Sequence, residues 1–145
     1  MSAALASFAP RPRALWIEAL VARDLGALTA ALHAAAEPIR HLDDLLVAII
    51  VTAARHLDAH DALRTVLAHE PEVLLPHLTF DAAGAALDRA GHALAPLLAP
   101  HVGDDRAVRA GEWVARTALA YLCAPNDLVR LTDPNSVRAL VTDFL

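Results

Sequence analysis

The sequence predicts an all-α fold from two observations. Apolar residues make up 57% of the chain and aromatic residues only 4%, because most of the apolar content is alanine and leucine, which favour helix interiors. Apolar residues also recur at helical spacing between prolines and glycines, without the alternation typical of strands. At 145 residues, the chain has the length of one domain and can bury a core.

The first long helix is expected from Arg13 to about Ala36. Its apolar side chains recur every three or four residues, and Pro38 ends it because proline cannot continue a helix. Residues 1–12 contain two prolines. They are therefore expected to form an irregular lead-in to a single domain that spans residues 13–145.

A second helix is expected from about Ile39 to His56. It contains the longest apolar run of the chain, LLVAIIVTAA at residues 45–54. A membrane-spanning helix needs about 20 such residues, roughly twice this length. Because its apolar side chains lie on almost every side, the segment is predicted to be the central buried helix of the domain, with no role in a membrane.

Shorter and glycine-containing elements follow. A short helix is expected at residues 61–69, and EVLLPHLTF at residues 72–80 is expected to form another short segment. An alanine-rich helix is then predicted at residues 80–98. Its glycines would allow another helix to approach closely and its prolines would mark its end; these residues are Gly84, Gly91, Pro96 and Pro100.

Two closing helices are expected, at residues 104–124 and 134–145, which makes about seven helices in a bundle. The longer one carries acid-before-base pairs at helical spacing, a pattern typical of a solvent-exposed stripe; they are Asp105, Arg109, Glu112 and Arg116. In the last helix, Asp133 is the expected N-cap and Pro134 the expected first helical residue.

Both closing helices carry apolar surface that needs a cover. Residues 117–125 contain no charge, and the last helix has an apolar stripe. Pairing with the same two helices of a second subunit would bury both, so a homodimer is predicted. The alternative, that the two helices pack only on their own core, stays open. The expected interface residues are Gly111, Ala115, Ala118, Leu119, Leu122, Val137, Leu140, Val141 and Phe144.

Net charge and cysteine usage argue against several classes of protein. The net charge is −5 and the pI is about 5.8, the wrong sign for a surface that binds a phosphate backbone. The single Cys123 cannot form a disulfide framework, which is compatible with a reducing cytoplasm. MSAALASFAP at the start has no basic residue before its apolar ones, so a secretory signal peptide is not expected.

Three stretches carry a family resemblance. They are RALWIEALVARDLGAL at residues 13–28, HDALRTVLAHEPEVLLPHLT at residues 60–79 and RAGEWVARTALAYLCAPNDLVRLTDPNSVRALVTDFL at residues 109–145. In that order they resemble the helix leading out of the DNA-binding head, a short-helix pair and the closing helix pair of the tetracycline-repressor (TetR) family of bacterial regulators. The resemblance covers most of residues 13–145 and implies the family's C-terminal domain, which binds an effector and dimerises through its last two long helices.

The start of the chain departs from that family. Its members usually begin with a DNA-binding head of about 45–50 residues that contains a helix-turn-helix. No basic segment and no helix-turn-helix-like pattern precedes Arg13, where Arg11 is the one basic residue, although FAPRPRALW at residues 8–16 is faintly similar to the junction at the end of that head. DNA is therefore expected to be bound only through a head that this chain does not contain, and whether that head is naturally absent or was removed stays open.

The resemblance also implies a ligand site. In similar proteins the effector lies among the first long helix, the central helix and the helices expected here at residues 80–98 and 104–124. A cavity lined by apolar side chains with few polar groups implies a small lipophilic effector. The expected ligand-binding residues are Leu46, Ile49, Ala53, His77, Phe80, Ala83, Leu87, Trp113 and Thr117.

Metal and catalytic sites are not expected. His56 and His60 are four residues apart and could face the same way, but no cysteine or second pair of ligands supports a metal site. The histidines are therefore interpreted as helix-end and surface residues, and no metal or other cofactor is expected. No serine, cysteine or carboxylate pair has a neighbour that would activate it, so the chain is not expected to be an enzyme.

The sequence thus favours the ligand-sensing and dimerisation domain of a cytoplasmic TetR-like transcriptional regulator. Two other functions stay open. One is a head-less interaction protein that pairs with a full-length regulator, and the other is a stand-alone carrier of a hydrophobic metabolite.

Overall fold

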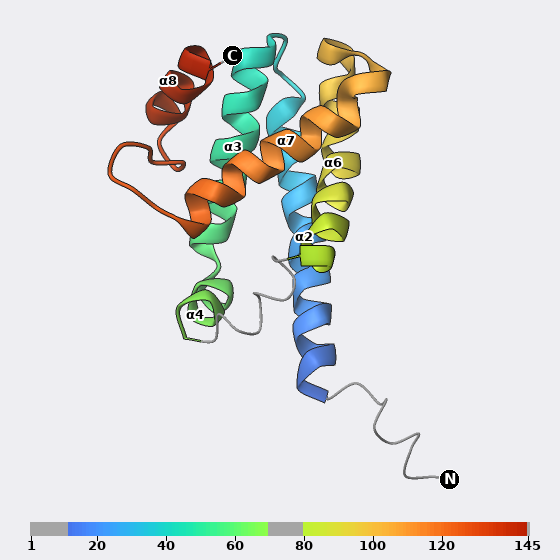
Figure 1. The fold of residues 1–145 in the computed structure, drawn as a ribbon, viewed down its shortest axis with the longest axis vertical. Coiled ribbons are helices and arrows are strands. Elements are labelled where there is room, and N and C mark those ends of the chain that lie inside the picture. The colour runs from blue at the N-terminus through green and yellow to red at the C-terminus, as the bar shows by residue number, and fades with distance from the viewer. Residues whose placement is uncertain (1–11, 70–79, 145) are drawn as a thin grey trace.

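The protein is described by a computed structural model that covers residues 12–69 and 80–144; within these ranges, the side chains of residues 12–18, 20, 21, 63, 66–68, 80–83 and 123 are not described. The described residues form helices and short connections without a strand, which confirms the all-α class (Figure 1). The helices are α2 (Pro12–Ala36), α3 (Leu42–Ala59), α4 (Asp61–His69), α6 (Phe80–Val102), α7 (Asp104–Cys123) and α8 (Pro134–Phe144). The expected lead-in and the short segment at residues 72–80 fall almost wholly outside the described residues, so the total number of helices stays a prediction.

Helix α3 is the central element, as its apolar character predicts. It runs antiparallel to α2 and contacts α4, α7 and α8 as well (Figure 1). Helix α6 lies beside α2, and α7 returns from its end and crosses over α3 (Figure 1). The buried side chains of α3 are Leu45, Leu46, Val47, Ile49, Ile50, Val51 and Ala54. No helix within the described residues has the length and apolar character needed to cross a membrane.

Helix α3 begins and ends later than the sequence predicts. Pro38 does end α2, where the Ile39 N–H donates to the Ala36 carbonyl at 3.0 Å. The chain then has to reverse direction, and His41 keeps an extended backbone conformation with φ −106° and ψ 139°. The helix therefore starts at Leu42 instead of Ile39, with the carboxylates of its first turn favoured by the helix dipole.

Helix α6 continues past both prolines that were expected to end it. Pro96 and Pro100 lie inside the helix, four residues apart, and neither is buried. Each proline deprives the carbonyl four residues earlier of its usual partner, but on this side of the helix water can bind that carbonyl instead. The helix ends at Val102 because Gly103 has a φ of +88°, a conformation that glycine adopts without strain.

The closest approach between two helices lies at the crossing of α6 and α7. Gly91 and Gly111 are both buried there, and a Cβ atom on Gly111 would lie 2.7 Å from the carbonyl oxygen of Gly91. Gly91 thus has the role that the sequence predicts. Gly84 does not, because a Cβ atom there would meet no described atom within 4 Å. The sequence places three small residues, Gly111, Ala115 and Ala118, along one seam of α7 that would let another helix come close. At Gly111, this small-residue seam packs against α6 of the same chain.

The connection between α7 and α8 is held by side chains. The Asn126 side-chain oxygen accepts hydrogen bonds at 2.9 Å from the Leu128 and Val129 N–H groups. Asp133 caps α8 as predicted, since its carboxylate accepts a hydrogen bond at 3.0 Å from the Asn135 N–H. Leu131, between these two side chains, is buried. The hydrogen bonds and this buried leucine fix the turn, and α8 packs against α3 directly after it.

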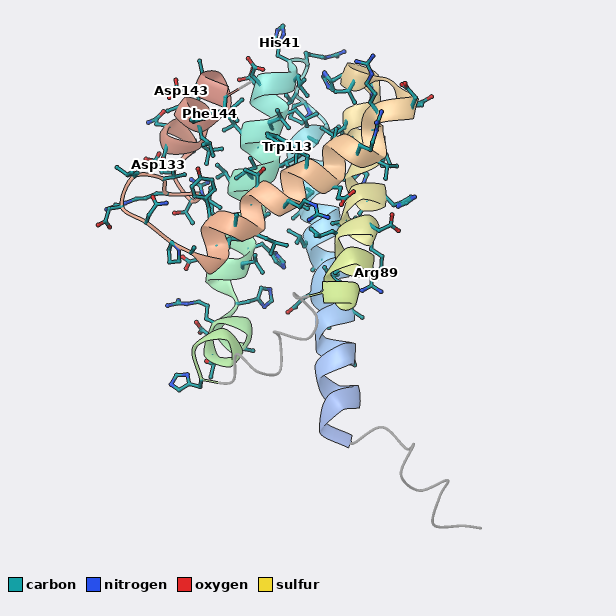
Figure 2. The ribbon with its side chains drawn as sticks, in the orientation of Figure 1. His41, Arg89, Trp113, Asp133, Asp143 and Phe144 are labelled. Carbon is teal, nitrogen blue, oxygen red and sulfur yellow. The ribbon has the colours of Figure 1, made fainter. Side chains whose placement is uncertain are left out.

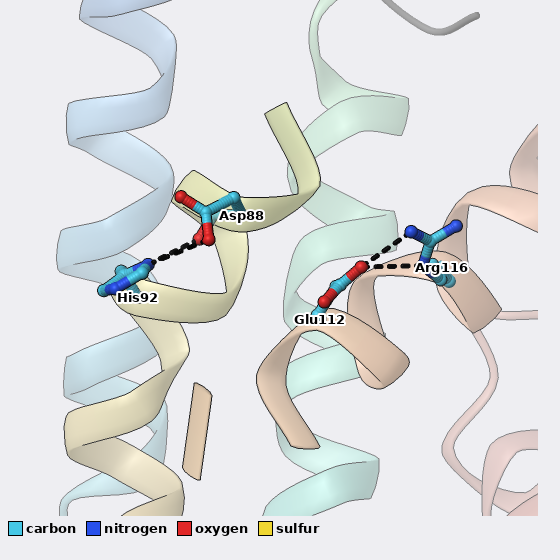
Figure 3. Close-up of polar contacts among 4 residues, drawn as sticks. All are labelled: Asp88, His92, Glu112 and Arg116. Atoms are coloured by element: carbon cyan, nitrogen blue, oxygen red, sulfur yellow. Dashed lines mark hydrogen bonds and ion pairs between the residues drawn. The ribbon is translucent and has the colours of Figure 1, made fainter. Parts of the chain in front are cut away.

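The predicted charged stripe of α7 is present in part. Arg116 donates from Nη2 and Nε to one carboxylate oxygen of Glu112, at 2.6 and 3.0 Å (Figure 3). Asp105, expected to pair with Arg109, lies 4.0 Å from the Arg106 side chain instead. Exposed pairs of this kind contribute only a few tenths of a kcal/mol.

Candidate ligand site

The expected ligand-binding residues are not brought together around one cavity in the described residues. Leu46 and Ile49 of α3 are packed in the hydrophobic core of the domain, and Ala53 lies partly buried against that core. Leu87 is buried on α6, and the Thr117 hydroxyl donates to the carbonyl of its own helix at Trp113. The Trp113 side chain is 45% exposed (Figure 2). His77 and the side chains of Phe80 and Ala83 fall outside the described part of the chain.

A polar cluster lies instead where the end of α3 faces α2. His56 is in the last turns of α3, and His60 is its C-cap residue, so helical spacing brings the two rings together with their centroids 4.6 Å apart. Asp24 of α2 completes the cluster, with its Oδ2 atom 3.6 Å from Nδ1 of His60. We name Asp24, His56 and His60 the polar trio. Among the described residues, it joins two helices that otherwise meet mainly through apolar side chains.

The polar trio is unusual because two of its atoms are buried without a hydrogen-bond partner. Asp24 Oδ2 and His56 Nε2 have no partner within the described part of the chain. Buried polar groups are nearly always paired, and one left unpaired costs about 1–3 kcal/mol. The Asp24 side chain is only 12% exposed, so bulk water offers it little compensation.

A second aspartate–histidine pair in the same fold shows the contrast. Asp88 and His92 lie on one face of α6, with a carboxylate oxygen 3.5 Å from the ring Nδ1, and both side chains are well exposed (Figure 3). The His92 ring also contacts the Asp88 carbonyl oxygen at 2.9 Å. These side chains are open to solvent, whereas two atoms of the polar trio are buried and have no hydrogen-bond partner among the described residues.

The geometry of the polar trio suits hydrogen bonding better than metal binding. Within the described ranges, no group of three or more histidine, cysteine, aspartate or glutamate side chains is placed to hold a metal ion. Imidazole can donate or accept a hydrogen bond, and a carboxylate accepts. The trio can therefore hold a polar group that donates to Asp24 and exchanges a hydrogen bond with His56.

Two open grooves lie away from the polar trio, and none of the expected ligand-binding residues lines either one. The α2–α6 groove, of about 800 Å³, lies between the ends of these helices, near His33 and Pro100. The α3–α8 groove has a volume of about 610 Å³. Its lining consists of Pro38, Ile39, Arg40, His41, Asp44, Val47, Ala48, Val51, Thr52, Arg55, Pro134 and Arg138.

The expected interface residues divide into covered and uncovered ones. Val137 and Val141 are buried against α3 and Gly111 against α6, so these three side-chain positions pack within the chain, while the homodimer itself stays a prediction. Leu122 also packs against the core. Half-buried or exposed residues remain: Ala115, Ala118, Leu119, Leu140 and Phe144, the last 76% exposed. The alternative that the closing helices pack on their own core is thus correct for their inner faces.

The sequence indicates that His56 and His60 could face the same way, but it assigns them no site, and it does not point to Asp24. The spacing of His56 and His60 suggests a shared helix face, which their ring contact confirms. The adjacent acid is Asp61, but that carboxylate is exposed and lies 4.0 Å from Arg64. Asp24 comes from another helix, and no local pattern of the sequence connects it to the histidines.

No protein-family model matches the chain, and searches of curated proteins and of solved structures found no similar protein.

Proposed function

We propose that this chain is the ligand-sensing and dimerisation domain of a TetR-like bacterial transcriptional regulator that acts in the cytoplasm. The observation that supports sensing is that two buried atoms of the polar trio, Asp24 Oδ2 and His56 Nε2, have no hydrogen-bond partner among the described residues. Buried polar atoms without a hydrogen-bond partner lower the free energy of unfolding, and a ligand that pairs with them would raise it again. The effector of this proposal is a small lipophilic molecule that carries one hydrogen-bonding group.

The lipophilic part of the effector follows from the surroundings of the polar trio. The core residues of α3 nearest to it along the helix are apolar, Ala53 and Ala54 among them, and the described part of the chain has no fully buried polar residue. A ligand with several polar groups would leave some of them without partners. An alcohol, phenol or amine brings one hydrogen-bonding group to the trio, and its apolar body adds no polar group that would need a partner.

Binding at the polar trio would act on the relation between α2 and α3. The ligand would stabilise the arrangement in which Asp24 and His56 face the same polar group, and so shift the population towards it. Helix α3 also contacts the turn before α8, because Arg55 donates from Nε to the Thr132 carbonyl at 3.2 Å. In a complete regulator, such a shift would change the spacing of two DNA-binding heads.

The experiment is a thermal-shift titration of the purified chain with decanol, decylamine and 4-octylphenol, each below its micelle-forming concentration. A compound that binds only the folded protein raises Tm by an amount that grows with concentration. We expect at least one probe to do so. Asp24→Asn should greatly reduce that rise, because the amide presents a donor as well as an acceptor to the ligand.

Asp88→Asn is the matched control, since it alters an aspartate–histidine contact of the same kind on an exposed surface. It should leave the ligand-induced rise unchanged. If no probe shifts Tm, or if both variants respond like the unmutated chain, the sensing role fails. The exposed apolar side chains Trp113, Leu128 and Phe144 would then favour the interaction-protein alternative.

A further inference from the structure

The α3–α8 groove has an apolar floor. Val47 and Val51 of α3 are buried at its base, with Ala48 between them. Helix α8 forms the opposite wall, and its Pro134 and Arg138 lie along the edge of the groove. The volume of about 610 Å³ is in the range of about 300–1,000 Å³ that is typical of small-molecule sites.

The rim of this groove is basic, in contrast to the chain as a whole. Three arginines line it, Arg40, Arg55 and Arg138, against the single carboxylate of Asp44. The whole chain has a net charge of −5. A local excess of positive charge on an acidic protein attracts an anion to this place more than to others.

The arginines of the rim are not equally free to bind. Arg138 donates to Asp44 at 2.7 Å, so its charge is largely neutralised. Arg55 uses only Nε in its bond to the Thr132 carbonyl at 3.2 Å. That bond fixes the base of the guanidinium, and both Nη atoms can still bind an oxyanion in the bidentate manner typical of arginine.

We propose that the α3–α8 groove binds a small amphipathic anion, with a carboxylate, sulfate or phosphate on Arg55 and an apolar body along Val47, Ala48 and Val51. A metal ion would be repelled by the arginines. A nucleic acid would need phosphate contacts over a longer basic surface than this acidic chain presents. In the lining of the α2–α6 groove, which shares Arg40 with the α3–α8 groove, Glu37 balances that arginine, so the groove offers no comparable excess of one sign.

The test is calorimetric titration of the Asp24→Asn variant, in which the polar trio no longer accounts for the binding of uncharged probes. The ligands are decanoate, and decanol and decyltrimethylammonium as probes that share its chain but lack the negative charge. We expect saturable binding of decanoate and at least about tenfold weaker binding of both other probes. Affinity for decanoate should fall as salt concentration rises. Decanol binding as tightly as decanoate in this titration would overturn the proposal.

Variants locate the site. Arg55→Gln should weaken decanoate binding at least about tenfold, and Ala48→Glu should do the same by placing a carboxylate on the floor. Arg89→Gln, on the exposed side of α6 (Figure 2), is the matched control and should bind decanoate like the unmutated chain. Arg55→Lys keeps the charge and should retain part of the affinity, which separates loss of the anion contact from loss of the Thr132 bond.

This proposal is independent of the polar trio. Asp24→Asn should leave decanoate affinity unchanged while it reduces the response to the alcohol and amine probes. If Arg55→Gln, with helicity retained, binds decanoate as tightly as the unmutated chain, the groove is not the site. The sensing role at the polar trio would be unaffected by that result.

Discussion

Gly91 and Gly111 bring the backbones of α6 and α7 into direct contact. A Cβ atom on Gly111 would lie 2.7 Å from the Gly91 carbonyl oxygen, and one on Gly91 would lie 2.8 Å from the Val108 carbonyl oxygen. Backbone atoms in a packed helix pair cannot move aside as the end of a flexible side chain can. The two helices therefore keep this close approach only while both positions lack a side chain.

Gly91→Ala and Gly111→Ala should each lower the free energy of unfolding, by about 1–3 kcal/mol, because the added methyl group forces α6 and α7 apart. Urea denaturation followed by far-UV circular dichroism measures the change. Gly26→Ala is the control: it lies in the interior of α2 with no described atom within 4 Å. That variant should gain about 0.5–1 kcal/mol from helix propensity. Equal effects at all three positions would contradict the close crossing.

If the chain forms the predicted homodimer, Phe144→Arg should convert it into monomers. Phe144 is 76% exposed in the single chain, so its loss should leave the fold of the subunit intact (Figure 2). In a dimer that pairs the outer faces of α7 and α8, the arginine would be buried without a partner. Light scattering gives the mass, and Leu119→Arg should act in the same way. Asp143→Arg, at the neighbouring exposed position, should remain dimeric. A monomeric mass for the unmutated chain would remove the basis of this prediction.

Asp133→Ala should lower the free energy of unfolding by about 0.5–2 kcal/mol, because the Asn135 N–H loses its cap. Chemical denaturation measures the difference. Asp143→Ala removes the same side chain from the other end of α8, where a carboxylate opposes the helix dipole. It should be neutral or slightly stabilising. A comparable loss for both variants would indicate that net charge, and not the cap, is responsible.

The chain alone should show no sequence-specific DNA binding. Its net charge is −5, and the basic rim of the α3–α8 groove is too short to follow a phosphate backbone. Electrophoretic mobility shift with promoter fragments at physiological salt is the measurement, and a nonspecific basic protein provides the positive control. Saturable retardation that survives competitor DNA would contradict this expectation.

Local signals in the sequence were sufficient for most helix boundaries. Pro38 after α2, and Asp133 with Pro134 before α8, act through neighbouring backbone atoms, so their effect does not depend on the rest of the fold. The central position of α3 followed from its apolar character for a similar reason. A segment that is apolar on nearly all sides is stable only when other helices surround it.

Pairings across the fold could not be predicted in this way. The small-residue seam of α7 predicts that another helix lies close to it, and α6 does so at Gly111. The same pattern would fit a helix of a second subunit equally well. Asp24 meets His60 only because α2 and α3 are antiparallel. Arg55 and Arg138 likewise come from two different helices and meet only at the rim of the α3–α8 groove. In the sequence, each looks like an ordinary surface residue.

The two prolines within α6 affect the order in which the domain assembles. Without an amide hydrogen at Pro96 or Pro100, the last turns of this helix have little intrinsic tendency to form, and a peptide of residues 80–102 should be frayed there in isolation. In the protein, Leu94 and Leu98 anchor these turns in the core. We therefore expect the hairpin of α6 and α7 to close from its glycine crossing outward, with the end of α6 becoming helical only when it docks.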